Sequence, residues 1–589
     1  MNGFDPDDAP LYAELLRYAA RKEASFHVPG HKDGHYYQNN AGEMPEGFGE
    51  VLRIDATEIE GTDDLHDPEG VIREAQCKAA DFFGAEETFF LVGGSTVGNL
   101  ALILSVCREP GDLLIVQRNV HKSVLNGLML AGARAVFVAP ENEPGTGLAV
   151  LPGEYTLDQA LVRYPEARGV FLTRPNYYGM GRSIREIARM CHERGIPLLV
   201  DEAHGAHYGL HPALPASALA EGADGVVQST HKMLAAMTMG AMLHVQGGLL
   251  DRSLLRRRLA MVQSSSPSYP IMASLDLARS VTQSRGEAAF APALQAAAQI
   301  RRELERLPRL GFVRPELSDG PAADAAAAGS RVQAPVPAAQ GHGEAFGGGA
   351  GSAYTEQDPL KIAVYDRRRV LSGYALQRRL AAAGCIAEMS DERRTVLALG
   401  IGSGMEDAER LIGALRQLQH ELDAEEAAAA QAALTSAGAE PAPLTLTEKK
   451  NAVDSALLTS CRQPATSASR DEKHSQQTKD LSSALAPEDT HFASSEDSLI
   501  ETNLLISEPV PFDLRSSGEA EVVSLEASKG RISAEMIVPY PPGIPLVYAG
   551  EIITESAVSQ LLKLREAGAR FQGASDASLL TLHVYLATK

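Results

Sequence analysis

Short apolar runs alternate with stretches of helical spacing through much of the first half of the chain, and this alternation constrains the fold most. Helical spacing occurs between most of the runs, for example at 97–107 and 184–193. Parallel neighbouring strands need such crossovers, because a tight hairpin joins only antiparallel strands. The sequence therefore predicts an α/β domain with a mainly parallel seven-stranded sheet. Its predicted strands are 88–92, 113–116, 135–138, 169–172, 197–200, 225–227 and 241–245.

Composition and pattern divide the rest of the chain. A second α/β pattern begins near residue 358, and order returns near residue 532 before a helix and a final strand. Two stretches poor in large apolar residues separate these parts. We predict an N-terminal segment at 1–50, a large domain at 51–300, a small α/β domain at 301–423 with a flexible loop at 318–352, a low-complexity insert or linker at 424–524, and a C-terminal domain at 525–589.

Charge and cysteine content restrict the function classes. Acidic residues outnumber basic ones by 76 to 54, which gives a net charge of −22. Such a chain repels phosphate, which argues against binding nucleic acid or anionic membranes. The 5 cysteines are scattered without a CxxC pair, which is typical of a reducing compartment. With no signal-like start and no long uncharged apolar run, we expect a soluble cytoplasmic protein.

An aspartate and a lysine follow two of the predicted strands. Asp201 lies in VDEAHGAHYG and Lys232 ends QSTHK. Both should emerge at the carboxyl edge of one sheet, where ligands bind in such folds. The pair suits pyridoxal phosphate, because a lysine forms a Schiff base with its aldehyde and a carboxylate pairs with its ring nitrogen. Taken singly, a strand-end aspartate is as often structural and a lysine is more often a surface residue.

Three other features fit the same cofactor less specifically. GGSTVGN at 93–99 joins a strand to a helix, so Ser95, Thr96 and free helical N–H groups form a phosphate cradle or an ordinary capped turn. His121 opens the next helix and is either a ring-stacking residue or a cap. His231 is either a phosphate ligand and proton donor or a packed core residue. The spacing of His204 and His207 argues against a metal centre, and we predict none.

The motifs together resemble the ornithine/lysine/arginine decarboxylase family. They are FHVPGHKDG, DATEIEGTDDLHDPEG, GGSTVGN, RNVHKS, DEAHGAH, STHK and PYPPGIPLVYAGE. The resemblance covers about 8–421 and 532–589. It implies the aminotransferase-like fold, called fold type I among pyridoxal phosphate enzymes. It also implies smaller α/β domains at the C-terminal side of the large domain.

The resemblance also implies residue roles. Lys232 would form the Schiff base, with His121 and His231 as further catalytic residues. The cofactor-binding set would be Lys232, Asp201, Ser95, Thr96, His121, Ala203, His204, Ser229 and His231. Candidates to bind the substrate's distal cation are Glu388, Asp63 and Asp64. The family builds its sites at a dimer interface, so we expect a homodimer or higher homo-oligomer in which the PGHK and DDLH loops serve a neighbouring site.

The expected activity is decarboxylation of a basic L-amino acid. The chain resembles the short biosynthetic type, with no receiver-like wing domain before the large domain. This favours arginine, giving agmatine for polyamine biosynthesis, over lysine or ornithine. One departure is Asn176 in TRPNYYG, where the family pattern has threonine. Another fold type I enzyme, such as an aminotransferase or a β-eliminating lyase, remains an alternative. In an aminotransferase, Arg393 or Arg394 would bind the α-carboxylate. A non-catalytic homologue is the other alternative, although it would be expected to lose Lys232 or Asp201.

Overall fold

The computed structural model describes residues 5, 8–44, 46–314, 354–437, 505–512, 519–540, 543–566 and 568–586. The chain divides into two compact units, one of Met1–Arg416 with Glu501–Lys589 and one of Gln417–Ile500. The first unit carries every predicted site residue and is described below. None of the helices within the described ranges is both long enough and apolar enough to cross a membrane.

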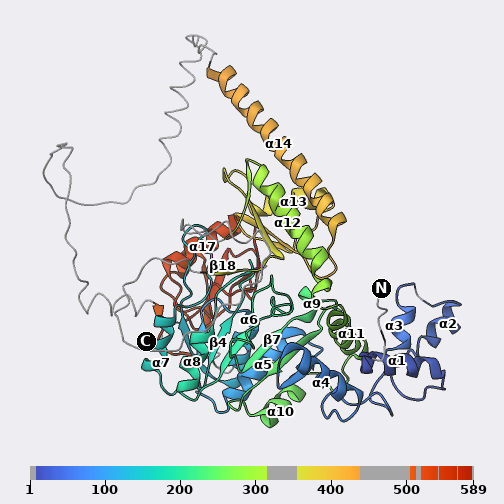
Figure 1. The fold of residues 1–589 in the computed structure, drawn as a ribbon. Helices are drawn as coiled ribbons and strands as arrows, with labels where there is room; N and C mark the ends of the chain where they lie inside the picture. Colours follow the sequence, from blue (N-terminus) through green and yellow to red (C-terminus); the bar gives the residue numbers. More distant parts are fainter. Residues whose placement is uncertain are drawn as a thin grey trace, which may run out of the picture. The chain divides into compact units, whose positions relative to one another are not determined.

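The centre of this unit is an eight-stranded sheet (Figure 1). Five neighbouring strands run parallel, and β8 runs antiparallel to β1 and β7. The predicted mainly parallel sheet is confirmed, with all seven strands in it and an eighth at one edge. In spatial order the strands are β1 (Glu87–Leu91), β8 (Ala241–Val245), β7 (Gly225–Gln228), β6 (Leu198–Asp201), β4 (Val170–Thr173), β2 (Leu113–Gln117), β3 (Arg134–Val138) and β14 (Val510–Pro511).

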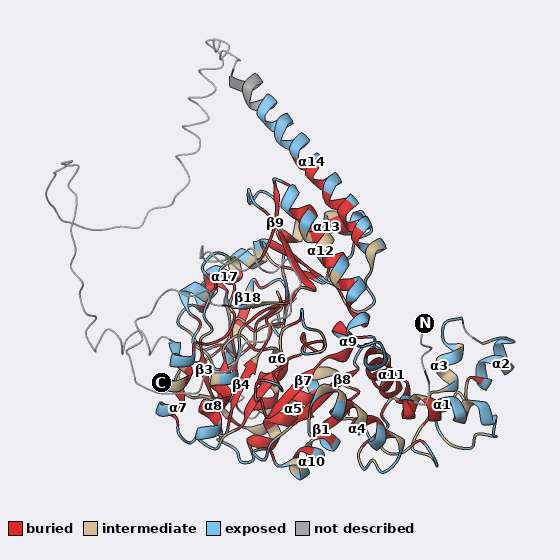
Figure 2. Cartoon of the chain, viewed as in Figure 1, coloured by how far each residue is buried: buried red, intermediate tan, exposed pale blue. Residues whose placement is uncertain are grey.

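Helices cover both faces of the sheet because successive strand side chains point to opposite sides. On β2, Leu114 and Val116 belong to one buried cluster, while Leu113 and Ile115 belong to another. Figure 2 shows the buried residues concentrated on the strands. The first cluster includes residues of α5 (Gly94–Val106), α6 (Lys122–Ala131) and α10 (Arg252–Val262), and the second includes residues of α7 (Glu154–Arg163) and α8 (Arg185–Glu193).

The N-terminal helices pack beside the β1 edge. A third buried cluster joins Leu11 and Leu15 to Ile72 and Met272. Asp276 fixes this contact, because its Oδ2 accepts a hydrogen bond of 2.9 Å from the backbone N–H of Leu11. The helices of this region are α1 (Pro10–Arg21), α2 (His35–Ala41), α3 (Gly49–Arg53), α4 (Val71–Phe83) and α11 (Tyr269–Arg285).

A second, antiparallel sheet forms the predicted small α/β part, in the order β12-β13-β11-β9. A two-stranded ladder of β5 (Met180–Gly181) and β10 (Glu356–Gln357) ties it to the large part. The predicted loop at 318–352 lies outside the described residues. The elements are β9 (Leu310–Phe312), β11 (Lys361–Asp366), β12 (Met389–Ser390), β13 (Arg394–Ala398), α12 (Ala291–Arg306), α13 (Gly373–Ala382) and the start of α14 (Met405–Ala437).

The C-terminal part has its own buried cluster, which includes Leu525, Ile537, Leu561 and Val584. It contains the helix and the final strand that the sequence predicted after residue 532. The elements are β15 (Ala520–Ser524), β16 (Val538–Tyr540), α17 (Glu555–Glu566), β17 (Arg570–Gln572) and β18 (Thr581–Tyr585), paired as β15 with β18 and β16 with β17.

The predicted insert at 424–524 differs from the structure at both ends. Helix α14 continues to Ala437, and β14 and β15 lie inside the predicted range. The strand β14 forms because an edge is available, as Val510 pairs with Ala135 of β3 and Phe512 packs on Phe137. The other residues of the range, 438–504 and 513–518, lie outside the described part.

Candidate active site

The carboxyl ends of β4, β6 and β7 meet the starts of α5 and α6 around a cavity of about 290 Å³. All nine residues predicted to bind the cofactor line it. Adjacent parallel strands explain this convergence, because Asp201 ends β6 opposite Val227 of β7, and Ser229 follows one residue after β7 ends. The complete lining is Gly93, Gly94, Ser95, Thr96, Asn99, His121, Ser123, Thr173, Pro175, Tyr177, Asp201, Ala203, His204, Ser229, His231, Lys232, Thr238 and Met239.

Lys232 projects from α9 (Thr230–Met233), the single helical turn that follows β7. Its Nζ lies 3.1 Å from Nε2 of His204. The side chain is accessible from the cavity, yet protein surrounds it, and this desolvation lowers the pKa of Lys232 despite the negative charges of Asp201 and Glu388. Lys232 therefore becomes a neutral amine, the form that attacks an aldehyde, at a lower pH than an ordinary lysine.

Asp201 is a fixed, buried carboxylate with 4 % of its surface exposed. Its Oδ2 accepts a hydrogen bond of 2.9 Å from Nδ2 of Asn99, and its Oδ1 accepts one of 3.1 Å from the backbone N–H of Ala203. Its charge also raises the pKa of Lys232 and of His121. The acid and the amine thus face one cavity and interact electrostatically.

His121 caps α6, which is one of the two roles that the sequence left open, and its ring also lines the cavity. Its Nδ1 accepts a hydrogen bond of 3.2 Å from the backbone N–H of Ser123, which caps α6, while its ring lines the cavity. Burial lowers the pKa of His121, and the positive charges of Lys232 and Lys122 add to that shift while Asp201 opposes it. The ring is therefore neutral at neutral pH.

The predicted phosphate cradle lies at the start of α5. The Oγ atoms of Ser95 and Ser229 are 2.5 Å apart, and no side chain caps the helix. The N–H of Gly94 donates to the carbonyl of Met239 over 2.8 Å, so the N–H groups that follow it in the first turn are the ones left for a phosphate. His231 places its Nδ1 2.9 Å from the carbonyl of Gly240. The Nδ1–H donates to that oxygen, so a neutral His231 has only an acceptor at Nε2 and must be protonated to bind a phosphate there.

Sequence reasoning missed several lining or adjacent residues, among them Asn99, Thr173, Tyr177 and Lys361. The ring of Tyr177 lies 4.9 Å from that of His204, and Nζ of Lys361 lies 3.2 Å from Nδ1 of the same histidine. Asn99 falls within the quoted GGSTVGN motif and could have been found there. Lys361 belongs to another part of the chain, and only the tertiary fold brings it to this point.

The three predicted substrate carboxylates behave differently. The charge of Glu388 raises the pKa of Lys232, so this residue lies near the cavity although it does not line it. Asp63 instead accepts hydrogen bonds from backbone N–H groups of the loop before α4, and Asp64 accepts one from the N–H of His66. Neither Asp63 nor Asp64 lines the cavity of its own chain.

Most of the other polar residues singled out by the sequence have structural partners. Arg394 lies 3.2 Å from Asp391 and also donates to the carbonyl of Thr146, and it does not line the cavity. The Oδ1 of Asn176 accepts hydrogen bonds from two backbone N–H groups of its own turn. His207 is fully buried, with Nε2 3.0 Å from Oδ2 of Asp358. Arg393 is exposed.

The PYPPGIPLVYAGE segment packs beside the loop that carries His121. The backbone N–H of Lys122 donates to the carbonyl of Gly543 over 3.2 Å. Arg118 donates to Glu551 over 2.9 Å and stacks 3.8 Å above the ring of Tyr548. The C-terminal part thus supports one wall of the cavity, which the sequence did not predict.

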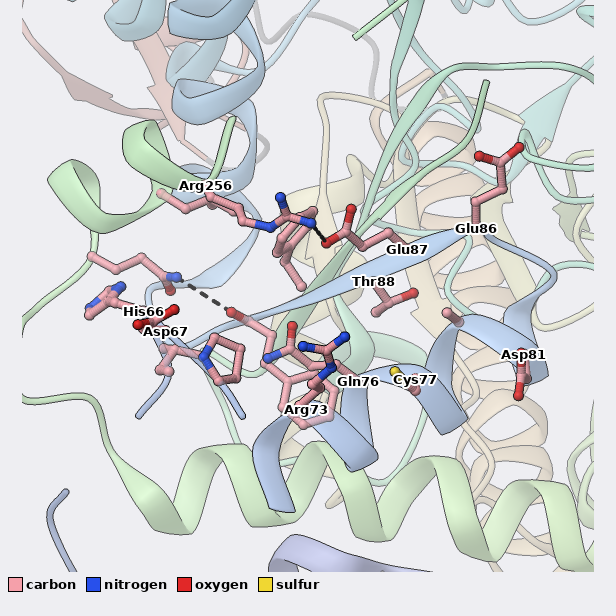
Figure 3. Close-up of a pocket in the computed structure, with 17 residues that line it drawn as sticks. His66, Asp67, Arg73, Gln76, Cys77, Asp81, Glu86, Glu87, Thr88 and Arg256 are labelled. Atoms are coloured by element: carbon pink, nitrogen blue, oxygen red, sulfur yellow. Dashed lines mark hydrogen bonds and ion pairs between the residues drawn. The ribbon is translucent and has the colours of Figure 1, made fainter. Parts of the chain in front are cut away.

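A larger cavity of about 580 Å³ lies between α4, β1 and α10 (Figure 3). Arg256 from α10 reaches across to Glu87 of β1, and Gln76 lines the wall. None of the predicted catalytic or cofactor-binding residues lines this cavity. Size alone therefore does not identify the site, whereas the chemistry of the smaller cavity does.

The smaller cavity fits pyridoxal phosphate. Hydroxyl and helical N–H donors match its phosphate, Asp201 matches its ring nitrogen, and Lys232 matches its aldehyde. Two buried lining atoms, Oδ1 of Asn99 and Oγ1 of Thr173, have no hydrogen-bond partner within the described residues. Such atoms usually find a partner, and a bound polar molecule would supply one.

Comparisons with known proteins agree with this chemistry. The family profile described as Orn/Lys/Arg decarboxylase, major domain, matches residues 9–407, and the profile of the C-terminal domain of that family matches 512–576. The sequence is 35% identical to the uncharacterized protein YaaO of Bacillus subtilis over 98% of this chain and 99% of that protein. It is 29% identical to the arginine decarboxylase of the same organism over 98% of both chains.

Solved structures show the same fold. The lysine decarboxylase LdcF of Francisella novicida matches with a TM-score of 0.70 and 19% identity, over 98% of this chain and 80% of that one. The lysine decarboxylase A of Pseudomonas aeruginosa matches with a TM-score of 0.68 and 22% identity, over 98% and 80%. The predicted fold type I architecture is therefore confirmed.

Proposed function

Since the chain belongs to the Orn/Lys/Arg decarboxylase family, we propose that it uses pyridoxal phosphate to decarboxylate a basic L-amino acid, arginine first among the candidates. The observation that carries this proposal is the single cavity that Lys232, Asp201 and the start of α5 share. Arginine is supported by full-length similarity to arginine decarboxylases of three Bacillus-type bacteria at 29–30% identity. Lysine and ornithine are the alternatives.

Each cavity residue has a specific task in this reaction. When bound, pyridoxal phosphate supplies an electron sink for the bonding pair that remains when carbon dioxide leaves. Asp201, oriented by Asn99, would hold a proton on the ring nitrogen. Ser95, Thr96 and Ser229 line the cavity and would bind the phosphate, and His121 would lie against the ring. Ala203 and His204 line the ring as well.

The α-carbon must receive a proton in place of the lost carboxylate. Lys232 is the first candidate donor, with His121 and His231 as alternatives, because all three line the cavity. Glu388 is the proposed counter-ion for the distal cation of the substrate, since its charge already acts on Lys232. An aminotransferase is less well supported, because Arg394 is bound to Asp391 and Thr146.

A substrate panel tests the activity. The purified protein with pyridoxal phosphate is given arginine, lysine or ornithine, and amine product and carbon dioxide are measured. Agmatine and carbon dioxide in equal amounts are expected from arginine. Absence of carbon dioxide from all three would reject the decarboxylase proposal. Amine transfer to a keto acid without carbon dioxide would favour the aminotransferase instead.

Three broader features belong to the same proposal: a role in polyamine biosynthesis, a cytoplasmic location and a homodimeric assembly. The scattered cysteines support the location. Phe26 and Val28, in the PGHK loop, are 95% and 66% exposed, which supports burial of this loop against a second copy of the chain. Asp63 and Asp64 would then serve the neighbouring site.

A further inference from the structure

Three nitrogen-bearing side chains form a line from the small sheet to the cavity. Nζ of Lys361 lies 3.2 Å from Nδ1 of His204, and Nε2 of His204 lies 3.1 Å from Nζ of Lys232. Lys361 opens β11 and is only 2% exposed, and His204 is 7% exposed. Neither sequence motifs nor the proposed mechanism gave Lys361 a role.

We propose that Lys361 is a positioning residue that acts on Lys232 through His204. It donates a hydrogen bond to Nδ1 of His204, so the histidine carries its proton on Nε2 and donates that proton to the lone pair of Lys232. This inference rests on the proposed cofactor chemistry and deepens it, because the line of hydrogen bonds favours the neutral amine that captures the aldehyde.

The direction of the two hydrogen bonds follows from the number of N–H donors that each side chain carries. A neutral imidazole has one N–H donor and one acceptor, whereas an ammonium group only donates. Burial keeps the pKa of His204 well below its ordinary value, and the charges of Lys232 and Lys361 lower it further, so His204 is neutral. One lysine must therefore donate to His204 and the other must accept from it.

Burial lowers the pKa of both lysines and two carboxylates oppose this at each, and the fully buried Asp358 beside Lys361 supports Lys361 as the donor. Asp358 is fully buried three residues earlier in the chain, and its charge and that of Glu388 favour the cation on Lys361, against burial and the charge of Lys232. The pKa of Asp358 itself is lowered despite its burial, with His207 as the strongest lowering influence. Asp358 is therefore an anion, and the proposal puts the cation on Lys361, close to this buried charge.

Several charged groups lie around these three side chains and contribute to the pH dependence of cofactor capture. Asp201 and Glu388 act on Lys232, while His121 and His231 act on His204. These groups remain unchanged when Lys361 is replaced. Loss of Lys361 removes a nearby positive charge. It also allows His204 to carry its proton on Nδ1, so that Nε2 becomes a hydrogen-bond acceptor toward Lys232. Both effects raise the pKa of Lys232, so their signs agree.

The first test uses Lys361→Met, which keeps the length and buries an apolar side chain. Cofactor is removed from the protein, pyridoxal phosphate is added, and the rate of appearance of near-visible absorbance is measured against pH. We expect the midpoint of the rate profile to move up by about one pH unit, which is about tenfold slower capture at neutral pH. Lys78→Met, at a surface ion pair with Glu74, is the matched control and should match the wild type.

Two further variants separate positioning from a packing effect. Asp358→Asn removes a carboxylate that favours the charged form of Lys361. It should therefore also move the midpoint of the rate profile up. In a His204→Gln background, Lys361→Met should have no further effect on the midpoint, because the connecting histidine is gone. An effect of equal size in both backgrounds would overturn the proposal.

The readout also separates this inference from the proposed function. Cofactor capture is measured without substrate, so a protein that captures pyridoxal phosphate but releases no carbon dioxide leaves the role of Lys361 measurable. If Lys361→Met fails to fold, Asp358→Asn provides the comparison. Rate profiles of the folded variants that overlay the wild-type profile would contradict the proposal.

Discussion

Asp201 shows how much of the site is organised by the chain itself. Both of its oxygens accept hydrogen bonds, from Nδ2 of Asn99 and from the N–H of Ala203, so the carboxylate has one orientation. A carboxylate held in this way acts on the ring nitrogen without reorganising during the reaction. The fixed geometry makes Asp201 a sensitive position for substitution.

We predict that Asp201→Asn lowers kcat by about 10²–10³, the usual cost of one preorganised electrostatic contact. The amide has the same shape but cannot hold a proton on the ring nitrogen. Steady-state decarboxylation with saturating cofactor measures the effect. Asp81→Asn, at the exposed rim of the larger cavity, is the control and should leave kcat unchanged. A variant at position 201 with wild-type kcat would refute this role.

At the residue level, sequence identified the groups that belong to short motifs. Asp201, Lys232 and Ser95 follow predicted strands, and the common edge of a parallel sheet brings such residues together. Lys361 could not be found this way, because its contact with His204 depends on how the small sheet packs against the large one. Asp63 is the opposite case, because its motif suggested a substrate ligand. In the structure its carboxylate accepts hydrogen bonds from backbone N–H groups, which no motif reveals.

Among the elements, the C-terminal segment and the start of α6 are coupled at one glycine. Gly543 has a φ of +93°, and a Cβ placed there would lie 3.4 Å from Cδ2 and Nε2 of His121. Gly550 has a similar φ of +87°, but its Cβ would meet no atom within 4 Å. The two glycines thus share backbone strain and differ in their contact with the cavity wall.

We predict that Gly543→Ala weakens cofactor affinity, whereas Gly550→Ala does not. Both substitutions cost about 1–2 kcal/mol of unfolding free energy from the left-handed backbone. Only the first places a methyl group in contact with the ring of His121, which restricts the space that this ring can use when the cofactor binds. Titration with pyridoxal phosphate, together with thermal unfolding, separates the two effects. Equal affinities for the two variants would disprove the coupling.

Strand β8 carries a buried histidine that makes stability depend on pH. Burial lowers the pKa of His244 to about 3, and its Nδ1 and Nε2 contact Thr88 and Gln228 of the neighbouring strands. The unfolded chain binds a proton near the ordinary value of 6.5, but the folded one does not. Stability from this group is present above about pH 6.5 and is lost as pH falls toward 3.

We predict that His244→Gln reduces this loss, because glutamine keeps polar contacts and does not titrate. Between pH 6.5 and 5 the wild type should lose about 2 kcal/mol more unfolding free energy than the variant. Denaturant unfolding at both pH values measures the difference. If the unfolding free energy of the two proteins falls by the same amount, His244 does not contribute to the pH dependence of stability.

The sequence predicted elements well where apolar runs were several residues long. The seven strands of the large sheet and the helix near 556–567 are examples. It missed β14, because two residues carry no periodic pattern and the strand exists only through its pairing with β3. The stretch 424–524 as a whole is rich in Ala, Ser, Thr and Glu, which favoured an insert, although Phe512 is buried beside Phe137.

For the whole molecule, we predict that light scattering gives twice the 62.7 kDa chain mass. The reason is the exposed apolar surface of the PGHK loop around Phe26 and Val28. Phe26→Asp should shift the protein toward the monomer and reduce activity in parallel, since Asp63 and Asp64 do not reach the cavity of their own chain. A fully active monomer would exclude a shared site.

The most direct test of the account is the identity of the lysine that binds the cofactor. The protein is mixed with pyridoxal phosphate and reduced with borohydride, and its peptides are analysed by mass spectrometry. One phosphopyridoxyl group is expected on Lys232, and none on its buried neighbour Lys361. A label on Lys361 or on a surface lysine, with Lys232 unmodified, would contradict the account.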